Sequence, residues 1–411
     1  MRILFTTAWY PNRKDAGDGV FIQKHAQAVA RLNDVAVLMV QTDVAVQGWH
    51  IEVCPAESQI ASLHEVLVYV PKTRFEVPVL TGLVRLAWLM LGYLKGYRYI
   101  KRRYWQGQRP DVSHVNVLTR AAGLPWLLLK WHRIPYIITE HWSRYGREGA
   151  YPQSGMQLRL GRRFVRDASY VCPVSLNLEQ NMKRWQLDNR HYVRISNVVD
   201  TDTFTLALRR EARACVSLVH VSWMRDDSKN ISGLLHVLAR LKDVRQNFHF
   251  DFIGEGNDKA QLMALADDLQ LQSFVSFLPA QTGQALAHSL QQHDALVMFS
   301  HFENQPVSVL EALACGLPVI ATSVGTIPVM LAQKRGVTVP PGDEEQLLQV
   351  LVSFVDTCSR LSASQRQSDT LPQLRHTYVV EHHSPDTIAQ QFDVLYRSAL
   401  RSLHAGSASD V

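Results

Sequence analysis

Short apolar runs alternate with amphipathic segments along most of the chain. Segments with helical periodicity, such as 20–32 and 231–241, follow apolar runs that are short enough to be buried strands. Strands that alternate with helices predict parallel sheets. Two successive series of alternating strands and helices, similar in size, predict two doubly wound α/β domains that face each other across a cleft. The predicted strands are 3–7, 35–40, 65–70, 135–141, 170–174, 216–221, 248–253, 274–278, 295–299 and 317–322.

A more polar stretch at residues 204–215 separates the two series and is typical of an interdomain linker. We therefore expect one domain over 1–203 and a second over 204–384. Beyond them, residues 385–403 predict a last helix, because apolar side chains recur there at helical spacing. These side chains are Ile388, Phe392, Leu395, Tyr396 and Leu400.

The clearest candidate site follows the predicted strand 295–299. A polar loop, 300–305, comes first, and Pro306 then opens a short helix, because its fixed φ suits a first turn. Loops at the carboxyl ends of strands bind ligands in open α/β sheets. Glu303 lies in this loop, and Glu311 lies inside the helix among apolar positions. We expect Glu311 to be buried and to need a ligand hydroxyl pair or a cation as its partner.

Composition and charge narrow the class of protein. The chain has 411 residues, 46% hydrophobic and 19% charged, which is ordinary for a globular protein. The net charge of +6 is modest, but Lys and Arg concentrate between Arg85 and Arg166, which predicts an acidic partner for the first half. Five cysteines without zinc-like or redox spacing indicate a reducing cytosol, and the N-terminal apolar run is too short for a signal peptide.

Residues 83–105 combine apolar positions at helical spacing with a basic C-terminal end. The apolar part is too short to span a bilayer, which needs about 20 residues. Two interpretations stay open. A basic amphipathic helix bordered by Trp and Tyr suits a membrane interface, whereas the same pattern also fits a core helix with an exposed basic end.

Four further residues are of types suited to a phosphate-handling site. Gly19 precedes a predicted helix, where backbone N–H groups can approach a phosphate. His141 ends a predicted strand and is placed at the ligand edge of its sheet. Arg225 and Lys229 lie in the loop after the first strand of the second half, where a lysine can neutralise a diphosphate. Taken singly, each also fits an ordinary surface loop, rim histidine or solvent cation.

Together these features resemble the retaining GT-B glycosyltransferases of family GT4, over nearly the whole chain. The most specific feature is the pair Glu303 and Glu311, followed by Ala-Leu-Ala-Cys-Gly-Leu-Pro-Val-Ile-Ala-Thr. The resemblance implies two Rossmann-like domains, with the last helix crossing back to pack on the first. The supporting motifs are Gly19-Val-Phe-Ile, His141, Ser196-Asn-Val-Val-Asp200, Lys229-Asn230, Gly254-Glu-Gly256 and Pro340-Pro-Gly-Asp343.

The resemblance also assigns roles in the domain over 204–384, which would bind a nucleotide-sugar donor. Glu303 would contact the hydroxyls of the donor sugar, and Glu311 the ribose diol. Lys229 would stabilise the departing diphosphate, with Arg225 as a further cation. The N-terminus of the short helix would receive sugar and phosphate oxygens at Asn304, Gln305, Pro306 and Val307.

The domain over 1–203 would bind the acceptor. Gly19 would face the diphosphate through its amide, and His141 would line the reacting centre. A cationic transition state with a dianionic leaving group demands electrostatic stabilisation above all. Lysine and helix-end amides can meet this demand without a metal ion. The family accordingly implies no metal, no other cofactor and retention at the anomeric carbon.

The leading hypothesis is sugar transfer from a UDP- or GDP-sugar to a glycan or polyprenyl-diphosphate-linked acceptor, in bacterial surface polysaccharide or lipopolysaccharide biosynthesis. It predicts a cytoplasmic enzyme that contacts the inner face of the cytoplasmic membrane through 83–105 and binds no nucleic acid. Two alternatives stay open. One is a soluble transferase for a small metabolite, and the other is a non-catalytic scaffold that binds a nucleotide sugar.

Three positions depart from the family pattern. Trp223 stands where the family often has an arginine. Thr326 and Val329 replace the second glycine and the glutamate of its Gly-Gly-Ile-Pro-Glu turn. These differences concern contacts to the donor base and phosphates rather than the fold.

Overall fold

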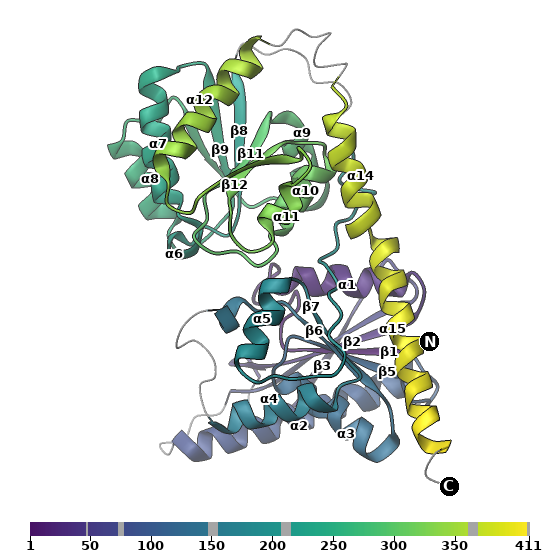
Figure 1. Cartoon of the computed structure of the whole chain (residues 1–411). Helices are drawn as coiled ribbons and strands as arrows, with labels where there is room; N and C mark the ends of the chain where they lie inside the picture. Colours follow the sequence, from purple (N-terminus) through teal and green to yellow (C-terminus); the bar gives the residue numbers. More distant parts are fainter. Residues whose placement is uncertain (47, 73–77, 147–154, 207–214, 361–368, 409–411) are drawn as a thin grey trace. The chain divides into compact units, whose positions relative to one another are not determined.

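A computed structural model describes residues 1–46, 48–72, 78–146, 155–206, 215–360 and 369–408 (Figure 1). The chain forms two compact units. Unit 1 comprises Met1–Val198 and Pro385–Val411, and unit 2 comprises Val199–Ser384. Within the described ranges, unit 1 is built on a seven-stranded sheet and unit 2 on a six-stranded sheet. The predicted pair of doubly wound α/β folds is confirmed.

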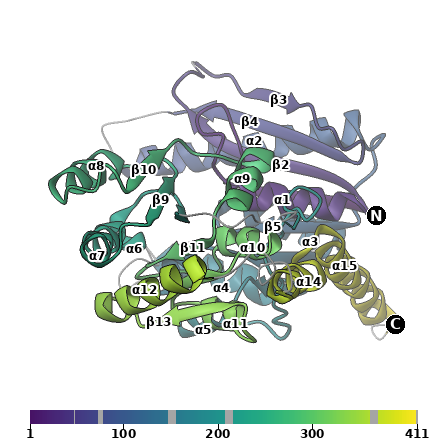
Figure 2. The same ribbon diagram turned by 90° about the horizontal axis from the view of Figure 1, so that it is seen from above.

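The sheet of unit 1 has the order β3-β4-β2-β1-β5-β6-β7. Its strands pair in parallel except β3, which runs antiparallel to β4 at one edge (Figure 2). The order reverses beside β1, so the carboxyl ends of β1 and β5 flank a topological switch point, where such sheets bind ligands. The strands are β1 (Arg2–Thr7), β2 (Asp34–Asp43), β3 (Glu52–Ala56), β4 (Leu63–Pro71), β5 (Val112–Asn116), β6 (Tyr136–Glu140) and β7 (Tyr170–Pro173).

Helices cover both faces of this sheet. Helices α1 and α15 pack together on one face, and α2, α3 and α4 lie side by side on the other. No helix in the described part of the chain is both long and apolar enough to cross a membrane. The helices are α1 (Val20–Ala30), α2 (Pro78–Arg103), α3 (Gly123–His132), α4 (Gly155–Asp167), α5 (Leu176–Arg184) and α15 (Pro385–Ala408), with 3-10 turns η1 (Arg120–Ala122) and η2 (Ser143–Gly146).

The last helix, α15, belongs to the core of unit 1. Phe392 and Tyr396 are fully buried against β1 and β5. The Tyr396 hydroxyl lies 2.7 Å from Nδ1 of His114, whose Nε2 lies 2.6 Å from Thr139 Oγ1 on β6. The predicted return of the C-terminal helix to the first half of the chain is therefore confirmed, and the helix continues beyond its predicted end at residue 403.

Unit 2 repeats the doubly wound plan with the strand order β10-β9-β8-β11-β12-β13, all pairs parallel. Its switch point lies between β8 and β11. Helices α7, α8 and α12 pack on one face, and α9, α10, α11 and α14 pack on the other. The strands are β8 (Val216–Val221), β9 (Phe248–Ile253), β10 (Val275–Leu278), β11 (Ala295–Met298), β12 (Val319–Thr322) and β13 (Gly336–Val339). The helices are α6 (Asp226–Lys229), α7 (Ile231–Val244), α8 (Lys259–Asp268), α9 (Gly283–Gln292), α10 (Val307–Ala314), α11 (Ile327–Leu331), α12 (Glu344–Arg360) and α14 (Leu371–His383).

Three strands, β3, β5 and β13, are absent from the sequence prediction. Strand β5 lacks a continuous apolar run because Ser113 and His114 interrupt it, yet both are fully buried. The β5 histidine can be buried because tertiary contacts satisfy both of its ring nitrogens. Strand β3 contains Pro55, which an edge strand tolerates because its outer N–H groups have no partner strand.

The contribution of α15 to unit 1 can be measured with two substitutions on the same helix. Phe392→Ala removes a fully buried ring and should destabilise the protein by about 3–5 kcal/mol. Val394→Ala removes methyl groups from a side chain that is 61% exposed, so its effect should stay within about 0.5 kcal/mol. Urea unfolding gives both values. Equal effects would mean that α15 does not pack as described.

Candidate active site

Two loops at the switch point of unit 2 bring the first pair of predicted site residues together. Lys229 ends α6 in the segment after β8, and Glu303 lies in the loop after β11. The Lys229 Nζ atom is 2.5 Å from Glu303 Oε1, and Ser300 Oγ donates a hydrogen bond of 2.9 Å to the same oxygen. A cation and a carboxylate that are 74 residues apart in the chain thus form one cluster.

The Lys229–Glu303 ion pair is largely shielded from water, which affects the ligands that it can bind. The Lys229 side chain is 19% exposed and the Glu303 side chain is buried. Two charges held out of water attract each other strongly but have lost much of their hydration, so they favour any ligand that supplies further polar partners. A lysine ammonium can bind anionic oxygens while the carboxylate accepts bonds from hydroxyl groups. The cluster is therefore suited to a ligand that carries both.

Hydrogen bonds to backbone carbonyl groups fix the position of the loop after β11 relative to its neighbours. The His301 N–H donates to Ser228 O over 2.9 Å, which ties the loop after β11 to the segment after β8. On the other side, Thr322 Oγ1 donates to Ser300 O over 2.6 Å from the end of β12. These contacts fix the backbone on both sides of Glu303.

The turn after β12 packs its backbone at Gly325 closely against the Glu303 loop. Gly325 has φ +56°, and a Cβ atom there would lie 2.1 Å from the Glu303 carbonyl oxygen. The neighbouring Thr326 donates to Asn304 O through both its N–H (3.0 Å) and its hydroxyl (2.8 Å). Thr326, which departs from the family glycine, thus adds a contact to the loop. Val329, the other departure in this turn, is exposed.

Helix α10 begins beside the Glu303 loop. Pro306 is its N-cap residue with extended geometry, so the helix itself starts at Val307. Because proline has no N–H, only Asn304, Gln305 and Val307 among the four predicted positions can donate from the backbone. Glu311 is buried in the middle of α10, which confirms the prediction of its burial.

The turn after β9 packs directly on the loop after β8. A Cβ atom at Gly254 would lie 1.9 Å from Ser222 O, and one at Gly256 would lie 2.1 Å from Met224 O. Both positions therefore require glycine. Trp223, between the two contacted residues, is exposed.

The Arg225 side chain makes no contact with the Lys229–Glu303 cluster among the described residues, although the Lys229 N–H donates to Arg225 O over 2.9 Å. It pairs instead with Asp227 over 2.8 Å, and both side chains are more than half exposed. An exposed pair of this kind contributes little to stability and can exchange partners readily. The predicted role of Arg225 at the phosphates stays a prediction.

Sequence reasoning missed His220 behind this site. This fully buried residue of β8 places Nδ1 3.0 Å from Val297 O on β11 and Nε2 2.7 Å from Ser222 Oγ. Burial, with the nearby charge of Lys229, lowers the pKa of His220 to about 4, so it is neutral at physiological pH. A histidine that directly follows the apolar residues Leu218 and Val219 was the available signal.

In unit 1, His141 follows β6 directly and is fixed from two sides. Its Nδ1 lies 3.0 Å from Asn197 Oδ1. Its backbone N–H and that of Trp142 each donate to Glu140 Oε1 over 2.9 Å. The other Glu140 oxygen accepts from Leu118 N at 2.8 Å and from a tyrosine hydroxyl of η2 at 3.0 Å. Glu140, which the sequence analysis did not single out, is thus a buried carboxylate that organises this edge.

The charge state of His141 follows from its surroundings. Burial holds its pKa well below the ordinary value, and the ring of His25, whose centroid is 5.1 Å away, lowers it further. His141 is therefore neutral near pH 7. A neutral imidazole can donate or accept a hydrogen bond, but it carries no extra proton to release.

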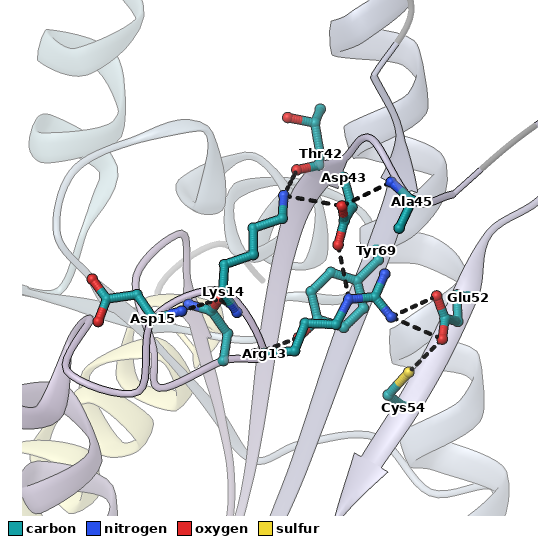
Figure 3. Close-up of polar contacts among 10 residues, drawn as sticks. Arg13, Lys14, Asp15, Thr42, Asp43, Ala45, Glu52, Cys54 and Tyr69 are labelled. Atoms are coloured by element: carbon teal, nitrogen blue, oxygen red, sulfur yellow. Dashed lines mark hydrogen bonds and ion pairs between the residues drawn. The ribbon is translucent and has the colours of Figure 1, made fainter.

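Gly19 caps the N-terminus of α1 in the left-handed conformation, with φ +64°. The loop before it is anchored to the sheet by Arg13 (Figure 3). Arg13 Nε donates to Asp43 over 2.8 Å, Nη1 reaches both oxygens of Glu52, and the guanidinium lies 3.8 Å from the centre of the Tyr69 ring. This clamp spans β2, β3 and β4 and holds the loop that ends at Gly19.

Comparison with known proteins identifies the family to which this chain belongs. Residues 21–198 match the family described as Glycosyl transferase 4-like domain, and residues 219–363 match Glycosyl transferases group 1. The chain belongs to the GT4 glycosyltransferases. This family of retaining enzymes uses nucleotide-sugar donors, as the Glu303 and Glu311 signature implies.

Solved structures with the same fold cover nearly the whole of this GT4 enzyme. Sucrose-phosphate synthase from Thermosynechococcus elongatus aligns over 98% of this chain and 99% of its own, with a TM-score of 0.74 at 17% identity. Anabaena Alr3699/HepE, determined in complex with UDP, aligns over 97% and 100%, with a TM-score of 0.70 at 15% identity. The fold is accordingly GT-B.

Curated relatives of this GT4 enzyme have varied names. The putative teichuronic acid biosynthesis glycosyltransferase TuaC of Bacillus subtilis is 22% identical over 86% of this chain and 89% of its own length. The D-inositol 3-phosphate glycosyltransferase of Mycobacterium sp. strain KMS is 30% identical over 56% of this chain, and the match spans 54% of that protein. Family membership therefore leaves the acceptor open.

The described residues of this glycosyltransferase contain no group of three or more His, Cys, Asp or Glu side chains placed to hold a metal ion. In unit 2, Lys229 and Glu303 lie in the segments after β8 and β11, and Glu311 lies in α10. In unit 1, Gly19 precedes α1 in the segment after β1, and His141 follows β6. The individual roles that the family resemblance gives to these residues stay predictions.

The close contact at Gly325 can be tested with a matched pair of glycines. Gly325→Ala should displace the Glu303 carbonyl and lower the affinity for a nucleotide sugar by about tenfold or more. Gly283→Ala is the control, because Gly283 has φ +55° but no atom within 4 Å of the new methyl group. Calorimetric titration with UDP- and GDP-sugars measures both affinities. Equal affinities in the two variants would contradict the supporting role of Gly325.

Proposed function

We propose that this glycosyltransferase moves a sugar from a UDP- or GDP-sugar to a glycan or polyprenyl-diphosphate-linked acceptor, with retention, in bacterial surface polysaccharide or lipopolysaccharide biosynthesis. The observation that carries the proposal is the partly buried pair of Lys229 and Glu303 at the switch point of unit 2. The pair offers a cation for a diphosphate and a carboxylate for sugar hydroxyls within one small site.

Unit 2 is the donor half in this proposal. Glu303 accepts hydrogen bonds from the hydroxyls of the transferred sugar, and Glu311 takes the ribose diol. Lys229 leaves Glu303 to bind the diphosphate, whose negative charge grows as the bond to the anomeric carbon breaks. The N–H groups at the start of α10 add to this stabilisation, because a helix N-terminus favours negative charge. No step of this scheme requires a metal ion.

Unit 1 is the acceptor half. The Gly19 amide faces the diphosphate, and neutral His141 hydrogen-bonds a hydroxyl at the reacting centre. The tie between His141 and Asn197 supports this role, because it fixes which ring nitrogen faces the ligand. The choice of UDP or GDP follows the family, and the UDP-glucose complex of Anabaena Alr3699/HepE favours a uridine nucleotide.

The comparisons limit the identity of the acceptor less than that of the donor. Among similar proteins, lipopolysaccharide outer core galactosyltransferase WaaB and TuaC are named for surface glycans, whereas N-acetyl-alpha-D-glucosaminyl L-malate synthase of Bacillus anthracis is named for a small acid. A soluble enzyme for a small metabolite is thus the alternative. The distribution of charge over unit 1 favours the first of these two classes.

Positive charge concentrates on one helical layer of unit 1. Helices α2, α3 and α4 carry eleven Lys and Arg residues, six in α2, one in α3 and four in α4, but only one acidic residue, Asp167. The whole chain has 43 Lys and Arg residues and 37 Asp and Glu residues, which leaves 32 basic and 36 acidic residues outside these three helices. The net positive charge of the protein therefore resides in these three helices.

The same layer exposes large apolar side chains. Leu83 on α2 is 62% exposed, Trp131 on α3 is 67% exposed and Met156 on α4 is 71% exposed. Helix α2 also buries a second face in the core, as the core-helix interpretation of 83–105 expects. Exposed apolar groups beside a dense positive charge suit the headgroup region of an anionic membrane. We propose that unit 1 contacts the cytoplasmic membrane through this layer, from the cytoplasmic side.

The catalytic part of the proposal is tested with Lys229→Ala and Glu303→Gln. Each variant should remain folded and lose about 10²–10³-fold in kcat, because each loses a charge that acts on the transition state. Sugar transfer to membrane extracts, followed with radiolabelled UDP- and GDP-sugars, measures the loss. EDTA should leave wild-type activity unchanged.

Lys183→Ala is the matched control for this experiment, because Lys183 pairs with Glu179 over 2.6 Å in unit 1, outside both candidate sites. It should retain near wild-type activity. Near-normal turnover of Lys229→Ala would contradict the donor-site proposal. A wild-type protein that binds a nucleotide sugar but never hydrolyses or transfers it would instead support the non-catalytic scaffold.

The membrane proposal is tested with the triple substitution Lys101→Glu, Arg102→Glu and Arg103→Glu. This variant should lose co-sedimentation with phosphatidylglycerol vesicles, since each basic residue near an anionic surface contributes about 1 kcal/mol. Arg240→Glu, on the surface of unit 2, is the single-site control and should sediment as the wild type does. Binding of the triple variant that equals wild-type binding would remove the membrane from the proposal.

A further inference from the structure

Arg120 occupies a defined position at the ligand edge of unit 1. It opens η1, which follows β5 and contacts β1, so it lies beside the switch point between these two strands. The Thr119 hydroxyl caps this turn by accepting the Ala121 N–H. One residue earlier, the Leu118 N–H is held by Glu140, the carboxylate that also fixes the His141 backbone. Arg120 is therefore anchored on the same edge as His141.

The guanidinium of Arg120 has no acidic partner among the residues that the structure describes. Its side chain is partly buried, and its Nε atom is buried without a hydrogen-bond acceptor. The titratable groups that act on it electrostatically include the Tyr93 phenol, whose hydroxyl donates to Thr7 O, and Arg85 of α2. Burial lowers the pKa of Arg120, and the positive charge of Arg85 lowers it too, although Tyr93 acts in the opposite direction.

Three other arginines, Arg375, Arg335 and Arg13, do have partners in the described structure. The buried Arg375 donates to Arg335 O and Gly316 O, and Arg335 donates to Met330 O. Arg13 has two carboxylates and a tyrosine ring. A partly buried cation without such partners costs stability, because desolvation of the charge is not offset. Arg120 is therefore in the state of a binding group whose partner is a ligand.

We propose that Arg120 forms an anion subsite in unit 1 that binds a phosphate ester or diphosphate group of the acceptor. The assignment of this anion to the acceptor rests on the proposed function, in which unit 2 binds the donor diphosphate. The planar fork of the arginine guanidinium donates to two phosphate oxygens at once.

The position of Arg120 places the subsite on the edge of unit 1 that the proposed function assigns to the acceptor, because Arg120 and His141 lie at the same edge of the sheet. A lipid-linked glycan and a soluble sugar phosphate share the chemistry that the subsite recognises.

Binding of inorganic pyrophosphate to the full chain tests the subsite without turnover. Titrations use the Lys229→Ala background, which removes the donor-side cation. Adding Arg120→Met should weaken pyrophosphate binding by about ten- to hundredfold, the loss expected for hydrogen bonds between charged groups. Unchanged affinity in the double variant would overturn the proposal. Farnesyl diphosphate that binds more tightly than pyrophosphate points to a lipid-linked source, and equal affinities point to a soluble phosphate ester.

Thermal unfolding separates this subsite from a structural role. Arg120→Met replaces an uncompensated cation with a neutral side chain of similar length, so Tm should stay constant or rise. Arg13→Met, the control, removes a cation that has partners, so its Tm should fall. A fall of Tm in Arg120→Met as large as in Arg13→Met would assign Arg120 to the fold and overturn the proposal. Because both readouts are independent of catalysis, a failure of the proposed transferase reaction would leave them interpretable.

Discussion

The ion pair of Lys229 and Glu303 is the contact on which the candidate donor site depends. It joins the segments after β8 and β11, the two strands that flank the switch point of unit 2. Taking two charges out of water is costly, and the structure offsets this cost with the pair itself and with the Ser300 hydroxyl. A ligand that offers a diphosphate to the lysine and hydroxyls to the carboxylate can replace these contacts without leaving either charge unpaired.

Glycines make this arrangement possible. Gly325 lets the turn after β12 pass under the Glu303 carbonyl, and Gly254 lets the turn after β9 pack on Ser222. A Cβ atom at these positions would lie 2.1 Å and 1.9 Å from a carbonyl oxygen, closer than the 3.0 Å that real Cβ atoms keep, so a side chain would force the loops to shift. Thr326 shows that the turn can depart from the family pattern and still hold the loop, because its hydroxyl donates to Asn304 O.

Glu140 and Arg120, two residues on the same edge of unit 1, differ in their hydrogen-bond partners. The buried Glu140 accepts four hydrogen bonds and thereby fixes the backbone around His141. Arg120, on the same edge, has no such partners among the described residues. The fold thus satisfies the Glu140 carboxylate, whereas Nε of Arg120 is buried without an acceptor in the described part of the chain. The surplus of basic residues on α2, α3 and α4 extends this electrostatic preference for anions over a whole face.

The alternation of apolar runs and helical periods determined the doubly wound folds, because both periods are local properties of the chain. It also placed Glu303 in a loop and the buried Glu311 within α10. Local pattern could not identify β5, whose buried His114 is stabilised by Tyr396 from the other end of the chain. Nor could it show that Lys229 pairs with Glu303 or that Arg225 pairs with Asp227. These outcomes depend on strand order, which decides which loops become neighbours and which charges meet.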